Sequence, residues 1–458
     1  MTGKEPLWTI AELERALAGE AREVIGQCAG PLGPVVTDSR RISRGCIFIA
    51  IRGAKFDGHD FVAGASAAGA GAVVVEHRVE GCSCPQIVVR DTLDAYGAIA
   101  RFWRRRFSSP VICVVGSNGK TTTTQMIASI LRVACGEAHA LATERNFNNQ
   151  IGVPMMLLKM RDTTQYSVIE AGMNHPGEMS RLASFIRPTV VVVTNAQREH
   201  QEFLDGVEAS ARENGLAIVS LPDNGVAVLP QTDGCAQIWA DLARARGCRT
   251  LWYAHGGESE VTVRRSAGGL TLSLADGRTA QIEFSLPGEH VAHDAAAAAA
   301  ASLAAGVPLD AVVRGLAQFR PVKGRGVHHR LSSGAVVVDE AYNANPDSMR
   351  AAIEVLGAMQ GPRILIAGDM AEVGDASEAA HAEIGAFARE KGIEEFWCAG
   401  EQMKAAAAAF GPAARHFETT QALQEAAIDA AKRPVSMLLK ASNCMGFAKI
   451  VDALLQGA

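Results

Sequence analysis

The sequence predicts an α/β protein with mostly parallel strands, divided into three domains. Short β-rich runs alternate with longer helical patterns over most of the chain, as they do in α/β folds. Most of these runs are continuously apolar, which is typical of parallel strands covered on both faces. The length of 458 residues allows roughly two or three domains.

Two changes in composition set the predicted domain boundaries. Residues 1–107 form the first segment, which closes with the basic stretch RRRFSSP at 104–110. Residues 108–322 form the second segment, and the stretch FRPVKGRGVHH at its end has the Pro, Gly and charge of an interdomain linker. Residues 323–458 form the third segment.

The clearest strands and one helix can be placed by pattern. Strands are expected at 111–115, 167–170, 190–194, 226–229, 336–339, 363–367 and 436–440. Alternating residues within 250–285 predict an antiparallel hairpin pair beside the parallel sheet. The run Ala295–Ala301 predicts a buried, closely packed helix, with Asp294 expected to cap it or to lie in its first turn.

Composition excludes several classes of protein. The net charge of −5, from 44 basic and 49 acidic residues, argues against a nucleic-acid binder that works by bulk charge. The N-terminus does not resemble a signal peptide, and no run reaches the ~18 apolar residues of a membrane span. The ten cysteines are scattered without a C-x-x-C pair, so reduced thiols and a cytoplasmic location are expected.

The stretch VICVVGSNGKTTTTQMIASIL, residues 111–131, has a glycine-rich loop between a predicted strand and a predicted helix. The loop has two residues between its glycines, where the usual phosphate-binding loop has more. Its N–H groups and the helix N-terminus form an anion site, which Lys120 and a Mg²⁺ on Thr121 would complete. An ordinary turn with an exposed lysine is the alternative. The predicted nucleotide-binding residues here are Gly116, Ser117, Asn118, Gly119, Lys120, Thr121 and Thr122.

Polar residues follow two further strands of the second segment. Glu170 ends one strand, and Asn195 and His200 follow the next. Active-site groups of open α/β sheets gather at such strand ends, where a carboxylate can bind a metal or orient a water. A helix-capping role for Glu170 and a structural role for His200 are the alternatives.

The third segment repeats this pattern after its own strands. One strand is followed by a polar cluster able to read a ribose or a base edge, which consists of Asp339, Tyr342, Asn343 and Asn345. Asp369 and Lys440 follow two other predicted strands.

Taken together and in this order, the motifs resemble those of the Mur ligase family. They are GSNGKTT, NFNNQIGVP, VIEAGMNHPGE, VVVTNAQREH, VVVDEAYNANPDS and LIAGDMAEVG, with TDSR, GCIFIAIRG and FDGHDF in the first segment. The resemblance covers essentially the whole chain. YNANPDSM and GDMAEVG are most similar to the members that add D-alanyl-D-alanine to a UDP-muramoyl tripeptide.

The resemblance implies a fold and a reaction. A small mixed α/β N-terminal domain would bind the UDP-sugar. A central domain with a mostly parallel mononucleotide-binding sheet would bind ATP and Mg²⁺, and a C-terminal Rossmann-like domain would bring the dipeptide. The reaction would be ATP-dependent amide synthesis through an acyl phosphate, in peptidoglycan precursor synthesis. The enzyme is expected to act as a monomer.

The resemblance also carries residue roles onto this chain. The catalytic residues would be Lys120, Glu170 and His200, and the metal ligands Thr121, Glu170 and His200. Residues around the nucleotide would be His290, Arg325, Asp339, Tyr342, Asn343 and Asn345, in addition to the glycine loop. Residues for the other substrates would be Asp38, Ser39, Arg40, Asn148, Asn149, Asp369, Lys440 and Ser442.

The sequence departs from the family at several positions. Related ligases often carry a carbamate-modified lysine after the position of His200, but no lysine lies between Lys159 and Lys323 here. Glu213 is then a candidate substitute anion, with a solvated helix face as the alternative. The family's H-N-x-x-N-A reads HVAHDA, with Val291 and Asp294 for asparagines.

A further departure lies near the C-terminus, where the family's K-G-S-R reads KASN. Ala441 stands for glycine, and Asn443 lacks the guanidinium that grips a carboxylate. These changes keep open a catalytically weakened paralogue that binds a nucleotide or UDP-sugar. Another ligase of the superfamily, acting on a different amino acid or a folate, is a second alternative. A simple phosphate-loop kinase is disfavoured by the matching first and third segments.

Overall fold

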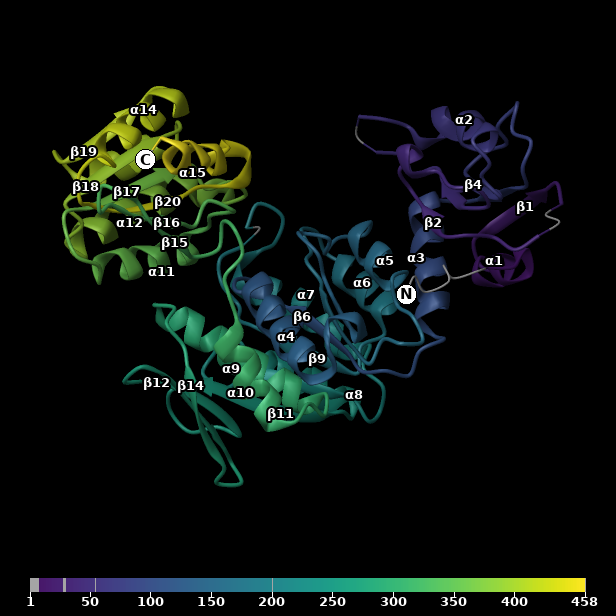
Figure 1. Ribbon diagram of the computed structural model, residues 1–458, viewed down its shortest axis with the longest axis horizontal. Helices are drawn as coiled ribbons and strands as arrows, with labels where there is room; N and C mark the ends of the chain where they lie inside the picture. The colour runs from purple at the N-terminus through teal and green to yellow at the C-terminus, as the bar shows by residue number, and fades with distance from the viewer. Residues whose placement is uncertain (1–7, 28–29, 54, 200, 458) are drawn as a thin grey trace.

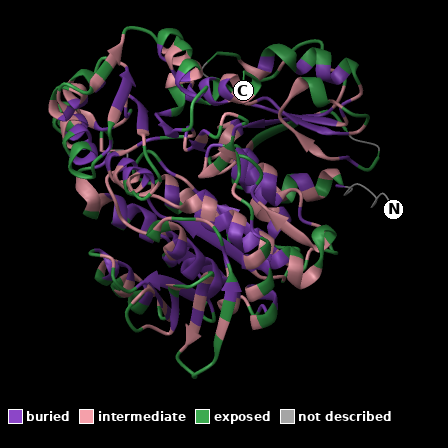
Figure 2. Cartoon of the chain, turned by 60° about the vertical axis from the view of Figure 1, so that its left-hand side comes forward, coloured by how far each residue is buried: buried purple, intermediate pink, exposed green. Residues whose placement is uncertain are grey.

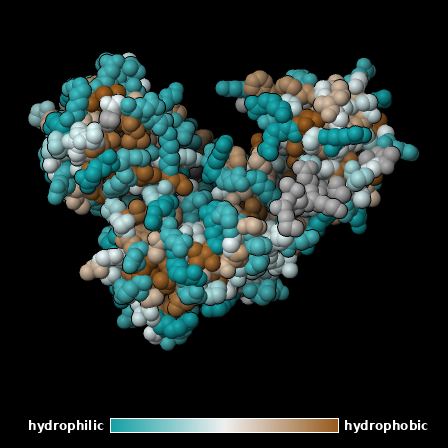
Figure 3. All heavy atoms as spheres, in the orientation of Figure 1, coloured by the Kyte–Doolittle hydropathy of each residue, from teal (hydrophilic) through white to brown (hydrophobic). Residues whose placement is uncertain are grey.

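The computed structural model describes residues 8–27, 30–53, 55–199 and 201–457. Their strands form three sheets, each covered by helices. Figure 1 shows the N-terminal part, in purple, and the C-terminal part, in yellow-green, on either side above a central teal part. The space-filling view shows a hollow between the two upper parts (Figure 3).

The first sheet has five strands in the order β1-β5-β4-β3-β2. β1 pairs antiparallel with β5 and the other neighbours are parallel, which makes the sheet mixed. Its strands are β1 (Ala21–Ile25), β2 (Val35–Val36), β3 (Ile47–Ile49), β4 (Ala72–Val75) and β5 (Gln86–Val89). The helices are α1 (Ile10–Ala16), α2 (Val62–Ala67) and α3 (Thr92–Arg104), with short 3₁₀ turns η1 (Ser39–Arg41) and η2 (Gly58–Phe61).

The central sheet has nine strands in the order β14-β13-β12-β11-β10-β9-β6-β8-β7. They are β6 (Val111–Val115), β7 (Ala140–Ala142), β8 (Tyr166–Glu170), β9 (Val190–Val193), β10 (Val226–Pro230), β11 (Arg249–His255), β12 (Val261–Ser266), β13 (Gly269–Leu274) and β14 (Thr279–Glu283). The helices are α4 (Lys120–Cys135), α5 (Gly152–Leu157), α6 (Glu178–Ile186), α7 (Gly206–Val219), α8 (Ala236–Arg246), α9 (Glu289–Ala304) and α10 (Leu309–Gln318), and η3 (Glu137–His139) is a 3₁₀ turn.

The antiparallel extension expected in residues 250–285 is present in part. β12, β13 and β14 pair antiparallel, but β11 pairs parallel with both β10 and β12. β11 therefore belongs to the parallel region, and the two hairpins are β12–β13 and β13–β14.

The alanine-rich helix α9 is buried, as predicted. Ala295 through Ala301 are fully buried, because α9 packs against the central sheet and against α4 and α10. The expectation for Asp294 was wrong: α9 begins at Glu289, so Asp294 lies beyond the first turn and is buried. The helix includes the residues Glu289–Asp294 before the alanine run, and the sequence pattern did not indicate this longer N-terminal part.

The third sheet has six strands in the order β15-β16-β20-β17-β18-β19. They are β15 (Val327–Arg330), β16 (Val336–Asp339), β17 (Arg363–Gly368), β18 (Glu395–Ala399), β19 (Ala414–Phe417) and β20 (Ser436–Lys440), and only β15 is antiparallel to its neighbour. The helices are α11 (Pro346–Gly357), α12 (Ser377–Glu390), α13 (Met403–Phe410), α14 (Thr420–Ala430) and α15 (Phe447–Gln456), with 3₁₀ turns η4 (Gly374–Ala376) and η5 (Asn443–Met445).

Buried strands covered by part-exposed helices recur in all three parts (Figure 2). The seven strands expected from continuous apolar runs agree with the observed strands to within one residue at each end. The predicted α/β class is confirmed. Within the described residues, no helix combines the length and apolar character needed to cross a membrane.

Polar contacts tie the central part to both neighbours. Arg181 of α6 pairs with Asp94 of α3 at 2.6 Å, next to the first sheet. On the other side, the Arg198 guanidinium contacts Asp347 of α11 at 2.6 Å and Glu383 of α12 at 2.7 Å. Arg198 lies in the loop after β9, so the third part rests directly on that loop.

Candidate active site

The glycine-rich loop joins β6 to α4 and is closely packed at both glycines. Gly116 has φ +123° and Gly119 has φ +79°, which L side chains rarely adopt. A Cβ added at Gly116 would lie 2.2 Å from Thr194 Oγ1, and one at Gly119 would lie 2.2 Å from Asp294 Oδ1. Both glycines are therefore required for the turn that brings the loop N–H groups to the start of α4.

Two asparagines from neighbouring elements accept hydrogen bonds from the backbone of this loop. Asn195, just after β9, accepts the Ser117 N–H on its backbone oxygen at 3.0 Å and the Asn118 N–H on its side-chain oxygen at 2.9 Å. Asn214 Oδ1 of α7 accepts the Gly116 N–H at 3.1 Å. The loop is thus fixed by its surroundings as well as by its glycines.

Lys120 begins α4 and folds back over the loop. Its Nζ donates to the backbone oxygens of Gly116 at 2.5 Å and Ser117 at 2.9 Å, and to Glu199 Oε2 at 3.1 Å. Glu199 comes from the loop after β9 and is 6% exposed. A buried carboxylate therefore faces the lysine that the sequence assigned to phosphate binding.

Glu170 ends β8 and points toward the start of α4. Its Oε1 accepts from Thr121 Oγ1 at 3.2 Å and from Asn148 Nδ2 at 2.8 Å. Its Oε2 is buried and has no hydrogen-bond partner within the described part of the chain. A buried carboxylate oxygen in this state is costly unless a cation or a donor joins it.

Arg325, in the segment that leads into the third sheet, reaches across to the central part. Its Nη2 lies 3.2 Å from Thr121 Oγ1, and its guanidinium lies over the ring of Tyr342 at 3.9 Å. The stacking on Tyr342 fixes the direction of the guanidinium. A cationic group from the third part therefore sits beside Thr121 and Glu170.

These groups line a cavity of about 870 Å³ between the central and third parts, which we call the phosphate cavity. Among its lining residues are Ser117, Asn118, Gly119, Lys120, Thr121, Asn148, Asn149, Glu170, Glu199, Arg325, Tyr342, Asn343, Asn345, Lys440 and Ser442.

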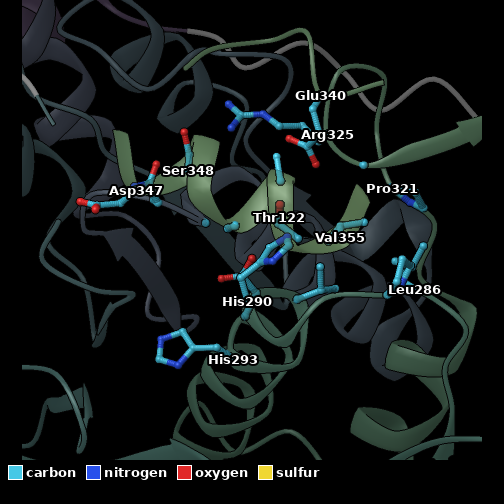
Figure 4. Close-up of a pocket in the computed structure, with 18 of the residues that line it drawn as sticks. Thr122, Leu286, His290, His293, Pro321, Arg325, Glu340, Asp347, Ser348 and Val355 are labelled. Atoms are coloured by element: carbon cyan, nitrogen blue, oxygen red, sulfur yellow. The ribbon is translucent and has the colours of Figure 1, made fainter. Parts of the chain in front are cut away.

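A second cavity of about 310 Å³ adjoins it, and we call it the apolar cavity. Its residues include Thr122, Leu286, His290, Val291, Asp294, Phe319, Pro321, Arg325, Val355 and Lys440. Figure 4 shows Thr122, His290 and Val355 near the middle of the view, with Arg325 above them and Pro321 and Leu286 to the right. Asn118, Gly119, Arg325 and Lys440 line both cavities, so the two form one continuous site. A planar apolar ring and an attached anion would fit the pair.

Burial shifts the titration of two groups in these cavities. It lowers the pKa of Lys440 and raises the pKa of Asp294 well above its ordinary range. Both shifts favour the neutral form. Lys440 Nζ donates to the backbone oxygen of Asn343 at 2.9 Å, which fixes the buried amine.

Two predicted acidic residues support the site from behind. Asp339 accepts the Gly324 N–H at 2.8 Å and the Ala341 N–H at 3.2 Å, and so positions the segment that carries Arg325. Asp369 accepts the Met403 N–H at 2.9 Å. Neither carboxylate is among the described residues that line the two cavities.

The remaining predicted residues fall in several places. Asn149 accepts the Gly152 N–H at 2.9 Å before the first turn of α5, and Ser442 accepts the Ala371 N–H at 2.7 Å. Asp38, Ser39 and Arg40 lie in and before η1 of the first part, where Arg40 pairs with Asp38 at 2.9 Å, and they line neither cavity. His200 lies outside the described residues.

Glu199 was not among the residues predicted from the sequence, which offered Glu213 as a candidate substitute anion or as part of a solvated helix face. Glu213 accepts the N–H groups of Gly177 at 2.9 Å and Met179 at 3.0 Å, at the start of α6. It is 7% exposed and does not face either cavity, so both the substitute anion and the solvated face were wrong. The position of Glu199 directly before His200 was the available signal.

Three family models match successive parts of the chain. They are described as Mur ligase family, catalytic domain, at residues 34–104; Mur ligase middle domain, at 114–302; and Mur ligase, glutamate ligase domain, at 324–443. A UDP-N-acetylmuramoyl-tripeptide–D-alanyl-D-alanine ligase of Escherichia coli (strain K12) is 35% identical over 432 residues, covering 92% of this chain and 94% of that protein. The chain belongs to the Mur ligase family.

Other members resemble this Mur ligase over its whole length. A Bacillus subtilis (strain 168) protein of the same name is 30% identical, with 97% of this chain and 99% of that protein covered. A crystal structure of MurF from Acinetobacter baumannii has a TM-score of 0.91 at 29% identity and covers 99% of this chain and 100% of that chain. The Thermotoga maritima MurF in complex with ADP has a TM-score of 0.81 at 22% identity, which bears on the fold alone.

These similarities confirm three predictions made from the sequence. They are the family with its MurF-type relatives, the three-domain α/β fold, and an ATP-dependent ligase enzyme. The domain boundaries at 107 and 322 and the individual residue roles stay predictions.

Proposed function

We propose that this Mur ligase adds D-alanyl-D-alanine to a UDP-N-acetylmuramoyl tripeptide in peptidoglycan precursor synthesis, with ATP and Mg²⁺. The observation that carries the proposal is the 35% identity to a ligase named for this reaction, over 92% of this chain and 94% of that protein. We also propose that it acts in the cytoplasm as a monomer, with the UDP-sugar on the first domain and the dipeptide on the third.

Phosphoryl transfer is the proposed first step. A carboxylate is a poor acyl donor because its oxygen leaves poorly. A tripeptide carboxylate oxygen attacks the γ-phosphorus of ATP, the bond to the β-phosphate oxygen breaks, and ADP departs. Lys120 and Arg325 line the phosphate cavity and would stabilise the charge on the transferring group.

Thr121 and Glu170 fit a magnesium ion. Mg²⁺ binds hard oxygen ligands and keeps several waters, so it needs few protein groups. The buried Glu170 Oε2 has no partner within the described residues, and Thr121 Oγ1 already lies 3.2 Å from the other carboxylate oxygen. When bound there, the ion would supply positive charge to the phosphate oxygens.

Amide formation is the proposed second step. The dipeptide amine attacks the carbonyl carbon of the acyl phosphate, the C–O bond to phosphate breaks, and the amine loses a proton. Inorganic phosphate leaves with the original carboxylate oxygen. The phosphate cavity is lined from both domains by Asn148, Glu170, Asn343 and Ser442, so closure of the third domain would exclude water from the acyl phosphate.

The apolar cavity is the proposed adenine site. Leu286, Phe319 and Pro321 give it an apolar wall, and Gly119 of the phosphate-binding loop also lines it. Val291 cannot hydrogen-bond a base through its side chain, so base contacts would come from other groups.

The test is phosphate release by the purified chain with ATP, Mg²⁺, UDP-N-acetylmuramoyl tripeptide and D-alanyl-D-alanine, omitting each in turn. Release that requires all three substrates, with a product heavier by the dipeptide, supports the ligase. Release with another amino acid or a folate in place of these substrates would favour a different member of the superfamily.

A weakened paralogue is the second candidate, because this chain carries Val291, Asp294 and Asn443 at positions where the family resemblance leads one to expect Asn, Asn and Arg. Asn443 donates to the backbone oxygen of Tyr342 at 3.3 Å. Measurable UDP-sugar binding without phosphate release would favour this candidate over the ligase.

A further inference from the structure

We infer that Glu199 couples nucleotide binding to a divalent cation, as a carboxylate ligand of the cation that accompanies the phosphates. This inference rests on the proposed function, since it assigns a role to one more residue of the same site. It starts from an arrangement that is unusual for an anion site. The buried carboxylate of Glu199 is hydrogen-bonded to Lys120, the lysine of the phosphate-binding loop.

Glu199 is held in place from two sides. Its Oε2 accepts from Lys120 Nζ at 3.1 Å, and its Oε1 accepts from Asn214 Nδ2 at 3.2 Å. Asn214 also accepts the Gly116 N–H at 3.1 Å through its Oδ1. One amide side chain therefore fixes both the glycine turn and the carboxylate, so the position of Glu199 relative to the loop is defined.

This carboxylate opposes the binding of a bare anion. Phosphates entering the cavity would compete for Lys120, and Glu199 would then lose its ammonium partner at a site where it is 6% exposed. Removing one partner of a buried ion pair is strongly unfavourable. The phosphate charges and the carboxylate would also repel each other at short range in a medium of low dielectric.

A divalent cation removes both penalties. Held by the Glu199 carboxylate, its charge would replace that of the ammonium ion and would offset the charge of the phosphates. A second observation points to cations in this cavity: Glu170, 2% exposed, lines it and has a buried Oε2 without a partner within the described residues. Glu170 is hydrogen-bonded to Thr121 and Asn148, whereas Glu199 is hydrogen-bonded to Lys120 and Asn214. The two carboxylates therefore have separate sets of partners at the start of α4.

The inference is tested by binding a non-hydrolysable ATP analogue to the full chain by calorimetry, with and without Mn²⁺. Glu199→Gln keeps the size of the side chain and removes its charge. We expect this variant to bind the metal-free analogue about tenfold more tightly than the wild type, and Mn²⁺ to improve its binding by about tenfold less. Electron paramagnetic resonance of free Mn²⁺, recorded with the analogue present, should show that Glu199→Gln binds Mn²⁺ more weakly than the wild type does.

Two variants make the result specific. Glu202→Gln makes the same change on an exposed residue of the same loop and should behave as the wild type in every measurement. Glu199→Asp keeps the charge, so it should keep weak metal-free binding even if Glu199→Gln folds poorly.

Three outcomes would overturn the inference or its basis. If Glu199→Gln and wild type show the same metal-free affinity and the same Mn²⁺ effect, Glu199 has no part in cation coupling and the proposed function stands. A gain in metal-free affinity in Glu199→Asp would also overturn the coupling, because this variant keeps the charge. If the wild type binds no analogue in either condition, the proposed function itself fails.

Discussion

Asn118 of the phosphate-binding loop and Asn345 at the start of α11 join two domains through a pair of side-chain hydrogen bonds. Asn345 Nδ2 donates to Asn118 Oδ1 at 2.9 Å, and Asn118 Nδ2 donates to Asn345 Oδ1 at 3.2 Å. The same Asn345 Oδ1 accepts the Ser348 N–H at 2.9 Å, which caps α11. The first turn of a third-domain helix is thus fixed against the loop that is proposed to hold the phosphates.

This pairing predicts different outcomes for two substitutions of Asn345. Asn345→Ala removes both the cap and the amide pair, and should lower stability by about 1 kcal/mol. Asn345→Asp keeps a good cap but loses the donor to Asn118, so stability should change little. Both variants should raise the KM for ATP, because the loop loses its third-domain contact. Thermal unfolding and steady-state kinetics measure the two effects, and a normal KM in Asn345→Asp would show that the cap alone matters.

Lys120→Ala should abolish phosphoryl transfer while the fold is retained. We expect phosphate release to fall by about 10³-fold or more, because a cation aimed at the transferring group is lost. Circular dichroism and UDP-sugar binding should be unchanged. Lys159→Ala is the matched control, since Lys159 pairs with Glu144 at 2.6 Å on an exposed surface. Unchanged turnover in Lys120→Ala would remove the loop from the mechanism.

Glu170→Gln should weaken metal binding without lowering the stability of the fold. The substitution keeps the acceptor for Thr121 and Asn148 but removes the charge from a buried carboxylate whose Oε2 has no described partner. Stability should therefore hold or increase slightly. The Mg²⁺ concentration needed for half-maximal phosphate release should rise by at least about tenfold. A titration of activity against Mg²⁺ that superposes on the wild type would contradict this role.

The hydrogen bond between the Met370 N–H and His381 in the third domain is expected to be sensitive to acid. Its Nε2 accepts the Met370 N–H at 2.9 Å, so its Nδ1 carries the proton and donates to the Ser377 backbone oxygen at 2.7 Å. Burial lowers the pKa of this imidazole below its ordinary value of 6.5. The folded state therefore favours the neutral ring, and its contribution to stability is complete above pH 6.5 and is lost as pH falls toward the lowered pKa.

The substitution His381→Gln tests this pH dependence, because an amide does not titrate. We expect the variant to lose less unfolding free energy than the wild type between about pH 7.5 and about pH 5.5. Equal losses in the two proteins would assign the acid sensitivity to other groups.

The elements that sequence predicted well are those with a strong local pattern. β6 and β9 are continuous apolar runs, and β8, β16 and β20 have short apolar runs beside a polar residue at one or both ends. All five strands are buried almost throughout. Short strands such as β2, with two residues, and β7, with three half-buried residues, carry too little pattern to be found. Alternation within 250–285 indicated the antiparallel β12, β13 and β14, but it does not reveal that β11 pairs parallel with both of its neighbours.

The site residues also fall into those with a local sequence signal and those without one. The spacing of Gly116 and Gly119 and the strand end at Glu170 are local signals, and these residues lie together as the pattern indicates. Lys120 and Glu199 are separated by 79 positions, and Asn118 and Asn345 by 227, so only the packing of the sheets and domains brings them together. Glu199 in particular lies several residues after the end of β9, in a polar segment whose composition is that of a solvated loop.

The most direct test of the proposed mechanism follows one oxygen atom. UDP-N-acetylmuramoyl tripeptide labelled with ¹⁸O in its terminal carboxylate is incubated with the enzyme, ATP, Mg²⁺ and D-alanyl-D-alanine, and the released phosphate is analysed by mass spectrometry. The mechanism predicts one ¹⁸O in each phosphate, because the carboxylate oxygen attacks phosphorus and leaves with it. Unlabelled phosphate would contradict transfer of the phosphoryl group to the carboxylate.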